Sequence, residues 1–122
     1  MNKIPLTRLS DTEKIAVKTF VHDIREQFQD QILAVALFGS KARGDDDPES
    51  DIDLIVIADS EDREFRSALW RIASKISLKY NVLISARIYS KKRWEKTCEI
   101  GLPISIAIIN ESIPLTPERI PI

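Results

Sequence analysis

Two aspartates lie at the start of an apolar segment, at a spacing that places them on one side of a strand. Side chains alternate across a β-strand, so Asp51 and Asp53 project to one face while Ile52 and Leu54 project to the other. Two carboxylates held this close repel each other unless a cation lies beside them. The spacing therefore predicts a divalent-cation site on this strand.

A small-residue turn precedes the two aspartates by about ten residues. Gly39 and Ser40 end the apolar run of residues 31–38, and a glycine at such a position lets the backbone turn and approach a ligand closely. If the turn opens a short helical segment, its N–H groups point at an anion such as the phosphates of a nucleotide. The cations that follow, Lys41 and Arg43, would either touch phosphate or face solvent.

The turn and the carboxylates together indicate a metal–nucleotide site. Mg²⁺ is commonly held by one or two carboxylates together with substrate phosphates. With this metal as Lewis acid and template, the chemistry implied is phosphoryl-type transfer. Taken singly, Gly39-Ser40 is an ordinary strand-ending turn and Asp51-Ile52-Asp53 a solvated strand start, and their joint occurrence favours the functional interpretation. The aspartates at 45–47 are interpreted as a solvated loop tip without chemistry.

The elements that must position these residues can be predicted from apolar periodicity and capping residues. We expect helices at about 11–30, after the Ser10/Glu13 capping box, at a segment capped by Ser60, and at a short segment that follows Ser90; strands at 31–38, 52–58 and 82–89; and an exposed loop at 41–50. This order predicts an α/β (α+β) sandwich, with helices packed on a small mixed sheet. The central position is assigned to the strand at 31–38.

The C-terminal part, residues 100–122, is less regular in pattern. Residues 103–111 fit either a short helix with Pro103 in its first turn or a fourth strand. The tail from Pro114 to Pro121 holds too many prolines for us to expect regular structure. We expect one domain over residues 1–122, with a core at about 10–95.

Composition restricts the classes of partner and compartment. The chain has 122 residues, 30% of them charged, with a formal net charge of −1, so no broad cationic surface for nucleic acid or membrane is expected. The single cysteine, Cys98, fits a reducing compartment, and no apolar run approaches a membrane span. Because residues 1–5 also lack the apolar segment of a signal peptide, we expect a cytoplasmic protein.

Four other residues have ordinary interpretations. His22 has no second histidine or cysteine partner and is expected on a helix surface. Cys98 is expected to be a small buried or half-buried residue and not a nucleophile. Trp70 and Trp94 are expected to be core or interface anchors, and Trp94 lies on a cationic segment that could also meet a partner.

The motif residues also form a longer pattern. Residues 39–44 read Gly-Ser-Lys-Ala-Arg-Gly and residues 50–54 read Ser-Asp-Ile-Asp-Leu. Over about residues 10–95 the chain resembles the minimal nucleotidyltransferase (MNT) branch of the DNA polymerase β-like nucleotidyltransferase superfamily. The resemblance implies the nucleotidyltransferase fold, with Gly39 and Ser40 binding the nucleotide triphosphate, and Asp51 and Asp53 as catalytic ligands of Mg²⁺.

The chain departs from this family at the third carboxylate of catalytic members, a metal ligand and base on the next core strand. Alignment by strand position puts Ser85 there. A neutral hydroxyl is a poor proton acceptor, so Ser85 would not serve as general base and Mg²⁺ binding would be weaker. Transfer is not excluded, because a dissociative transition state needs little from a base.

The resemblance also implies an activity and a partner. We expect transfer of a nucleoside monophosphate, AMP from Mg-ATP, to a hydroxyl of a partner protein. Among minimal members this points to an antitoxin whose partner is a HEPN-type toxin. Both a homo-oligomer and a hetero-oligomer are compatible with this expectation. The alternative is a nucleotide-binding module that regulates a partner by contact alone. An aminoglycoside-modifying enzyme is disfavoured, because such enzymes bring further residues for the drug.

Overall fold

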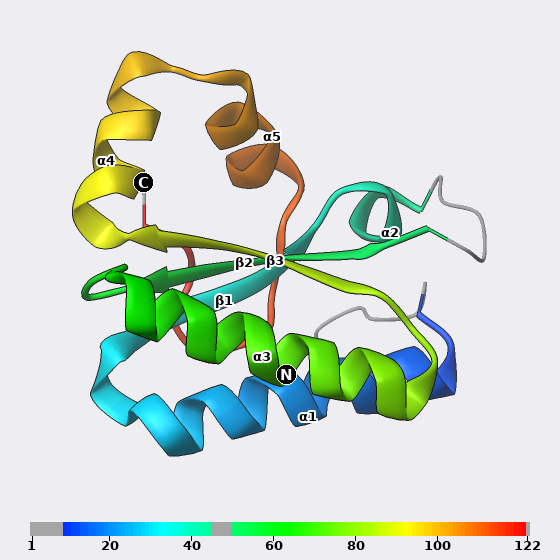
Figure 1. The fold of residues 1–122 in the computed structure, drawn as a ribbon. Coiled ribbons are helices and arrows are strands. Elements are labelled where there is room, and N and C mark those ends of the chain that lie inside the picture. The colour runs from blue at the N-terminus through cyan, green and yellow to red at the C-terminus, as the bar shows by residue number, and fades with distance from the viewer. Residues whose placement is uncertain (1–8, 45–49, 122) are drawn as a thin grey trace.

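The computed structural model describes residues 9–44 and 50–121 of the chain. Within these ranges the chain forms a four-stranded sheet with helices on both faces (Figure 1). The helices are α1 (Asp11–Phe28), the 3₁₀ turn η1 (Gln29–Gln31), α2 (Ser40–Arg43), α3 (Arg63–Tyr80), α4 (Lys91–Ile100) and α5 (Pro103–Glu111). The strands are β1 (Ile32–Phe38), β2 (Ile52–Ala58), β3 (Ile84–Ser90) and β4 (Ile113–Pro114).

The sheet is mixed, as the order of elements predicted. Its strand order is β3-β2-β1-β4, so β1 lies inside the sheet as expected. β1 runs antiparallel to β2 and β4, whereas β2 and β3 are parallel and are joined through α3, because parallel neighbours need a crossover connection. Figure 1 shows α1 and α3 on one face and α4 and α5 on the other. The predicted fold class is confirmed.

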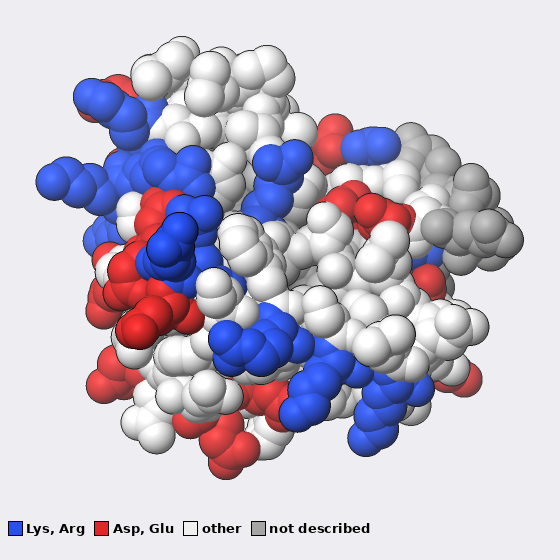
Figure 2. All heavy atoms as spheres, viewed as in Figure 1, with Lys and Arg blue, Asp and Glu red and all other residues white. Residues whose placement is uncertain are grey.

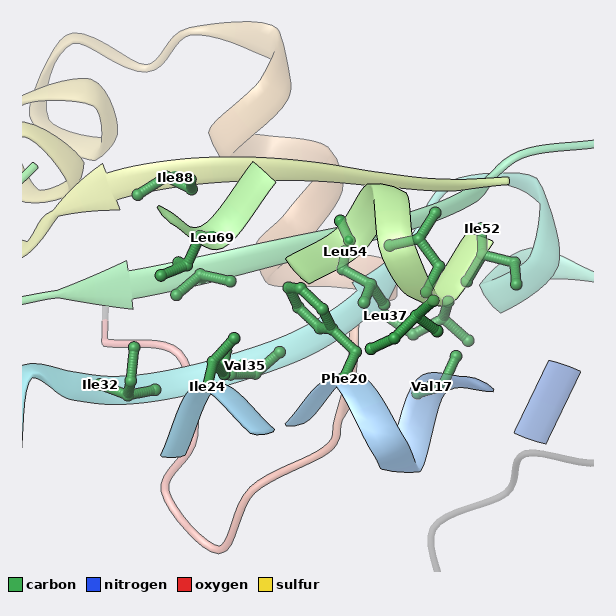
Figure 3. Packing of buried hydrophobic residues seen from close by; sticks show 14 of the residues in the cluster. Val17, Phe20, Ile24, Ile32, Val35, Leu37, Ile52, Leu54, Leu69 and Ile88 are labelled. Atoms are coloured by element: carbon green, nitrogen blue, oxygen red, sulfur yellow. The ribbon is translucent and has the colours of Figure 1, made fainter. Parts of the chain in front are cut away.

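Burial on both faces explains why β2 has a nearly continuous apolar sequence. Leu54 packs with Phe20 of α1 and Leu69 of α3 in the larger core cluster (Figure 3). On the opposite face, Ile55 packs in a second cluster that includes Trp94 of α4. Packing on both faces thus fixes the position of the sheet, and with it the position of the polar side chains that its strands carry.

The predicted capping box of the first helix is present. The Ser10 hydroxyl accepts a hydrogen bond from the Glu13 N–H, and the Glu13 carboxylate accepts one from the Ser10 N–H. The second predicted cap is wrong: α3 is capped by Asp62, whose carboxylate accepts from the Phe65 N–H at 2.9 Å. Ser60 lies two residues too early, and its hydroxyl contacts that carboxylate instead.

Two segments are more regular than we expected. The loop predicted at 41–50 begins as helix, since α2 extends through Arg43, and residues 45–49 lie outside the described part of the chain. Residues 103–111 form a helix, which decides between the two alternatives. The tail from Pro114 to Pro121 has no helix or strand after Pro114, as expected, but Pro114 itself pairs with β1 as the end of β4, where an edge position tolerates the missing proline N–H.

The isolated residues largely match their interpretations. His22 is exposed and pairs with Glu26 at 3.2 Å, and Cys98 is half-buried, where burial raises the pKa of its thiol. Trp94 is fully buried, but Trp70 is 44% exposed and is not a core residue. No helix in residues 9–44 or 50–121 is long and apolar enough to span a membrane.

Trp94 should be the most sensitive position of the second core cluster. Its ring packs edge-on against Tyr89, and its indole N–H donates to the Pro121 carbonyl at 2.6 Å, which ties the tail to α4. We expect Trp94→Ala to lower the free energy of unfolding by about 3–5 kcal/mol in urea titrations. Trp70→Ala, the exposed control, should cost about 1 kcal/mol. Equal losses would contradict this assignment of the core.

Candidate active site

The two predicted metal ligands lie at the start of β2, on the face that carries α4 and α5. Asp51 directly precedes the strand and is exposed, whereas Asp53 lies within it, half-buried, on the same side as Ile55. Burial raises the pKa of Asp53, and the negative charge of Asp51 raises it further. The carboxylates are therefore close enough to repel each other, as the spacing predicted.

The Gly-Ser turn meets Asp53 directly. β1 ends at Phe38, which pairs with Asp53 across the antiparallel ladder, and Gly39 follows with φ of +80°. Only glycine adopts this backbone conformation readily. A Cβ atom built on Gly39 would also overlap the Asp53 carboxylate, so both conformation and space require glycine here. The structure thus brings the turn and the carboxylate into contact.

Ser40 and Arg43 belong to the short helix α2 that follows this turn. The Gly39 carbonyl accepts hydrogen bonds from the N–H groups of Ala42 and Arg43, both at 3.1 Å. Arg43 forms an ion pair with Glu111 of α5 at 3.3 Å. Its positive charge also acts to lower the pKa of Asp53. Contact of Arg43 with a phosphate stays a prediction.

Lys41 has a different environment. Its side chain is buried, and its ammonium lies 3.0 Å from Glu13 of α1. The other carboxylate oxygen of Glu13 accepts the Ser10 N–H of the capping box. Direct contact of Lys41 with a phosphate stays a prediction, but in this structure the side chain connects α2 to the start of α1.

The neighbouring strand supplies a serine and an arginine. Ser85 is the register partner of Asp53 in the parallel β2–β3 pair, the position to which alignment by strand assigned it. Arg87 lies two residues further on the same face, and its positive charge also acts to lower the pKa of Asp53. Sequence reasoning missed Arg87, although a charged residue two positions after Ser85 in an apolar strand was the available signal.

The donor set fits a Mg²⁺ ion that completes its coordination with substrate oxygens. Asp51 and Asp53 supply hard carboxylate oxygens, and the Gly39 backbone lies directly against the Asp53 carboxylate because no side chain separates them. Among the residues that the structure describes, no group of three or more His, Cys, Asp or Glu side chains could hold a metal. The aspartates at 45–47 lie outside those residues.

Comparison with known proteins identifies the family. The chain matches the nucleotidyltransferase domain family over residues 17–113 and belongs to that family. Two Methanocaldococcus jannaschii proteins, both provisionally named protein adenylyltransferases, are similar to it. One is 45% identical over 76 residues, 62% of this chain and 77% of the relative, and the other is 36% identical over 84 residues, 69% and 80%. The chain is therefore a nucleotidyltransferase.

Solved structures confirm the fold. A provisionally named minimal nucleotidyltransferase superposes with a TM-score of 0.53 at 24% identity, over 87% of this chain and 97% of that one. A chain from a toxin–antitoxin crystal structure with AMP-PNP gives 0.52 at 18% identity, over 81% and 72%. A chain from the tri-AMPylated Shewanella oneidensis HEPN toxin in complex with MNT antitoxin gives 0.50 at 16%, over 84% and 71%. These likenesses confirm the expected nucleotidyltransferase fold.

Substitutions at Gly39 and Gly101, combined with a change at Asp53, test the contact between the Gly39 turn and Asp53. Both glycines have a φ near +80°, but Gly39 has a ψ of −159°, in a region that is essentially restricted to glycine, whereas Gly101 has a ψ of 37°, in the left-handed helical region. A Cβ on Gly101 would meet nothing within 4 Å. We expect Gly101→Ala to lower the free energy of unfolding by about 1–2 kcal/mol through backbone strain alone. Gly39→Ala should cost at least about 1 kcal/mol more, because of both its more restricted backbone region and the overlap. Asp53→Ala in that background should recover the part of the loss that the overlap causes. Equal costs at the two glycines would contradict the contact.

Asp53 should make the metal-free protein less stable at neutral pH. Its pKa is higher in the folded protein than the ordinary 3.8, so ionisation favours unfolding. The penalty is absent below 3.8, grows as the pH rises through the interval up to the raised pKa, and is complete above it. Asp53→Asn should therefore raise the Tm in chelator at pH 7, and this gain should shrink as the pH falls through that interval. A pH-independent difference would contradict the assignment.

Proposed function

We propose that this nucleotidyltransferase moves AMP from Mg-ATP to a hydroxyl of a partner protein. The observation that carries the proposal is the contact between the Gly39 turn and Asp53, which joins a phosphate-binding type of turn to a pair of carboxylates. The provisional names of the two relatives, protein adenylyltransferases, support AMP as the group and protein as the acceptor.

Each site residue has a proposed role. Gly39 and Ser40 bind the triphosphate, Gly39 by letting the backbone come close, and Arg43 adds positive charge beside it. Asp51 and Asp53 would hold Mg²⁺, which supplies Lewis-acid polarisation of the phosphate oxygens when bound. Lys41, through its ion pair with Glu13, holds α2 and the Gly39 turn against the start of α1.

The transfer itself requires little covalent chemistry from the protein. The acceptor oxygen forms a bond to the α-phosphorus, the bond from that phosphorus to the bridging oxygen breaks, and pyrophosphate leaves with the electron pair. The hydroxyl proton passes to solvent, because Ser85, beside Asp53, is a poor base at neutral pH. Positioning and charge stabilisation would supply most of the rate, as in other phosphoryl transfers.

The partner proposed for this chain is a HEPN-type toxin, with the chain acting as the antitoxin in a hetero-oligomer. Support comes from folds alone: similar chains occur in structures described as toxin–antitoxin complexes, one of them containing a tri-AMPylated HEPN toxin. In this proposal the chain inactivates its partner by adenylylation.

The second candidate is a binding module that holds nucleotide and regulates its partner without turnover. Ser85 favours it, since the register partner of Asp53 on β3 carries no charge. The two candidates share the nucleotide site. They differ in whether AMP is transferred to the partner, which the transfer of label from ATP would report.

Neutralising either carboxylate should remove metal-dependent nucleotide binding and transfer. With Asp51→Asn or Asp53→Asn, we expect calorimetric titration with Mg-ATP to show strongly weakened binding, and transfer of label from α-³²P-ATP to the genomic-neighbour protein to fall by about a hundredfold or more. Ser85→Ala is the control and should retain both. Tight complex formation without label would favour the binding module, and unchanged Mg-ATP binding in both carboxylate variants would contradict the site.

A further inference from the structure

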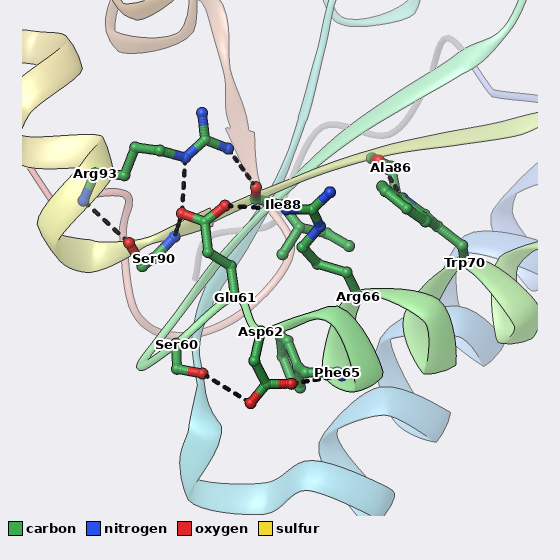
Figure 4. Close-up of polar contacts among 10 residues, drawn as sticks. All are labelled: Ser60, Glu61, Asp62, Phe65, Arg66, Trp70, Ala86, Ile88, Ser90 and Arg93. Atoms are coloured by element: carbon green, nitrogen blue, oxygen red, sulfur yellow. Dashed lines mark hydrogen bonds and ion pairs between the residues drawn. The ribbon is translucent and has the colours of Figure 1, made fainter.

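A groove of about 600 Å³ lies along the outer edge of β3. Its lining includes Glu61, Arg66, Trp70, Arg87, Tyr89 and Arg93, which come from β3, α3, α4 and the segment before α3. Figure 4 shows side chains of the groove lining, among them Glu61, Arg66, Trp70 and Arg93, beside β3. In Figure 2, Lys and Arg side chains lie across this face of the molecule, together with groups of acidic ones. We call this feature the β3 groove.

Side chains already cover much of the strand edge in the β3 groove. The Trp70 indole N–H donates to the Ala86 carbonyl at 3.1 Å, and Arg93 donates to the Ile88 carbonyl at 2.9 Å (Figure 4). The Ser90 N–H donates to the Glu61 carboxylate at 2.9 Å. Because these backbone groups are engaged, a ligand would be recognised by side chains and not by adding a strand to the sheet.

The charge of the β3 groove is positive. Among the described residues that line the groove, Glu61 is the one acidic side chain. Its carboxylate accepts a hydrogen bond from Arg93 at 2.7 Å and lies 3.9 Å from the Arg66 guanidinium. Arg93 is held over the Tyr89 ring at 4.1 Å, and Arg66 over the Trp70 ring at 5.2 Å. Three guanidiniums against one carboxylate form a local cationic site in a chain whose net charge is −1.

The position of the β3 groove relates it to the candidate active site. β2 lies between β1 and β3, so the Gly39 turn lies on one side of Asp53 and Ser85 on the other. Attacking and leaving oxygens are roughly in line in phosphoryl transfer. If pyrophosphate leaves on the side of the turn, the acceptor hydroxyl arrives over β3, past Arg87, which belongs to both the groove and the catalytic face.

We propose that the β3 groove binds an acidic segment of the acceptor protein and presents its hydroxyl to the site at Asp53. This inference rests on the proposed function. Arg66 and Arg87 pair with carboxylates of the segment, while Arg93 is already committed to Glu61 and the strand edge. Trp70, exposed at 44%, offers an aromatic surface for a side chain of the acceptor.

Protein is favoured over nucleic acid by two observations. The positive charge is confined to a short groove that also contains a carboxylate, whereas nucleic-acid binding usually needs an extended cationic surface along the phosphates. The relatives that share the family are provisionally named protein adenylyltransferases. A short single-stranded RNA is therefore the competitor in the test.

The test measures binding without nucleotide, by fluorescence anisotropy of a labelled glutamate–tyrosine copolymer, with a lysine–tyrosine copolymer and a short single-stranded RNA as comparators. We expect the acidic copolymer to bind tightest. Arg66→Gln combined with Arg87→Gln should weaken that binding about fivefold or more. The matched control, Lys75→Gln with Lys79→Gln, removes two charges from the separate cavity between α1 and α3 and should leave binding unchanged.

Three results would overturn the inference: no binding of the acidic copolymer, tighter binding of the RNA, or equal binding by the arginine and lysine double variants. Calorimetric titration of each variant with Mg-ATP separates this failure from that of the proposed function. If Mg-ATP binds and the copolymer result fails, the β3 groove is wrong while the nucleotide site stands. If Mg-ATP fails to bind to the unaltered protein, the proposed function is wrong, whatever the copolymer does.

Discussion

The close approach of the Gly39 backbone to the Asp53 carboxylate is the constraint on which the site depends. The antiparallel β1–β2 ladder sets it, because Phe38 and Asp53 are register partners and the turn begins one residue later. A residue with a side chain at position 39 would need both a strained backbone and a displaced carboxylate. The pairing of β1 with β2 therefore positions the Asp53 carboxylate beside the Gly39 turn, and a change in that pairing would also displace the carboxylate.

The sequence predicted this corner well because its signals are local. Alternation along β2 located Asp51 and Asp53, and a glycine after a buried strand indicated the turn. The register of Ser85 against Asp53 also followed from strand alignment. These inferences need only neighbouring residues in one strand, or the pairing of two strands whose apolar lengths match.

Long-range contacts escaped prediction. Lys41 was expected either to touch phosphate or to face solvent, and nothing in its neighbours along the chain indicates that its ammonium lies against Glu13, near the start of α1. The cap of α3 was a local error of another kind. Ser60 and Asp62 are equally good capping residues two positions apart, and the helix begins after Asp62. Arg87 was overlooked, since its importance comes from its place beside β2. Tertiary contacts decided the cases of Lys41 and Arg87.

The covered edge of β3 has a consequence for how copies of this protein can associate. Exposed strand edges are templates on which another chain can extend a sheet, the usual origin of fibrous aggregation. Here the indole of Trp70 and the guanidinium of Arg93 occupy backbone carbonyls on that edge, and at the opposite edge β4 is two residues long and ends in proline. Any lasting assembly would have to be built through helices and side chains, which favours closed complexes over open-ended polymers.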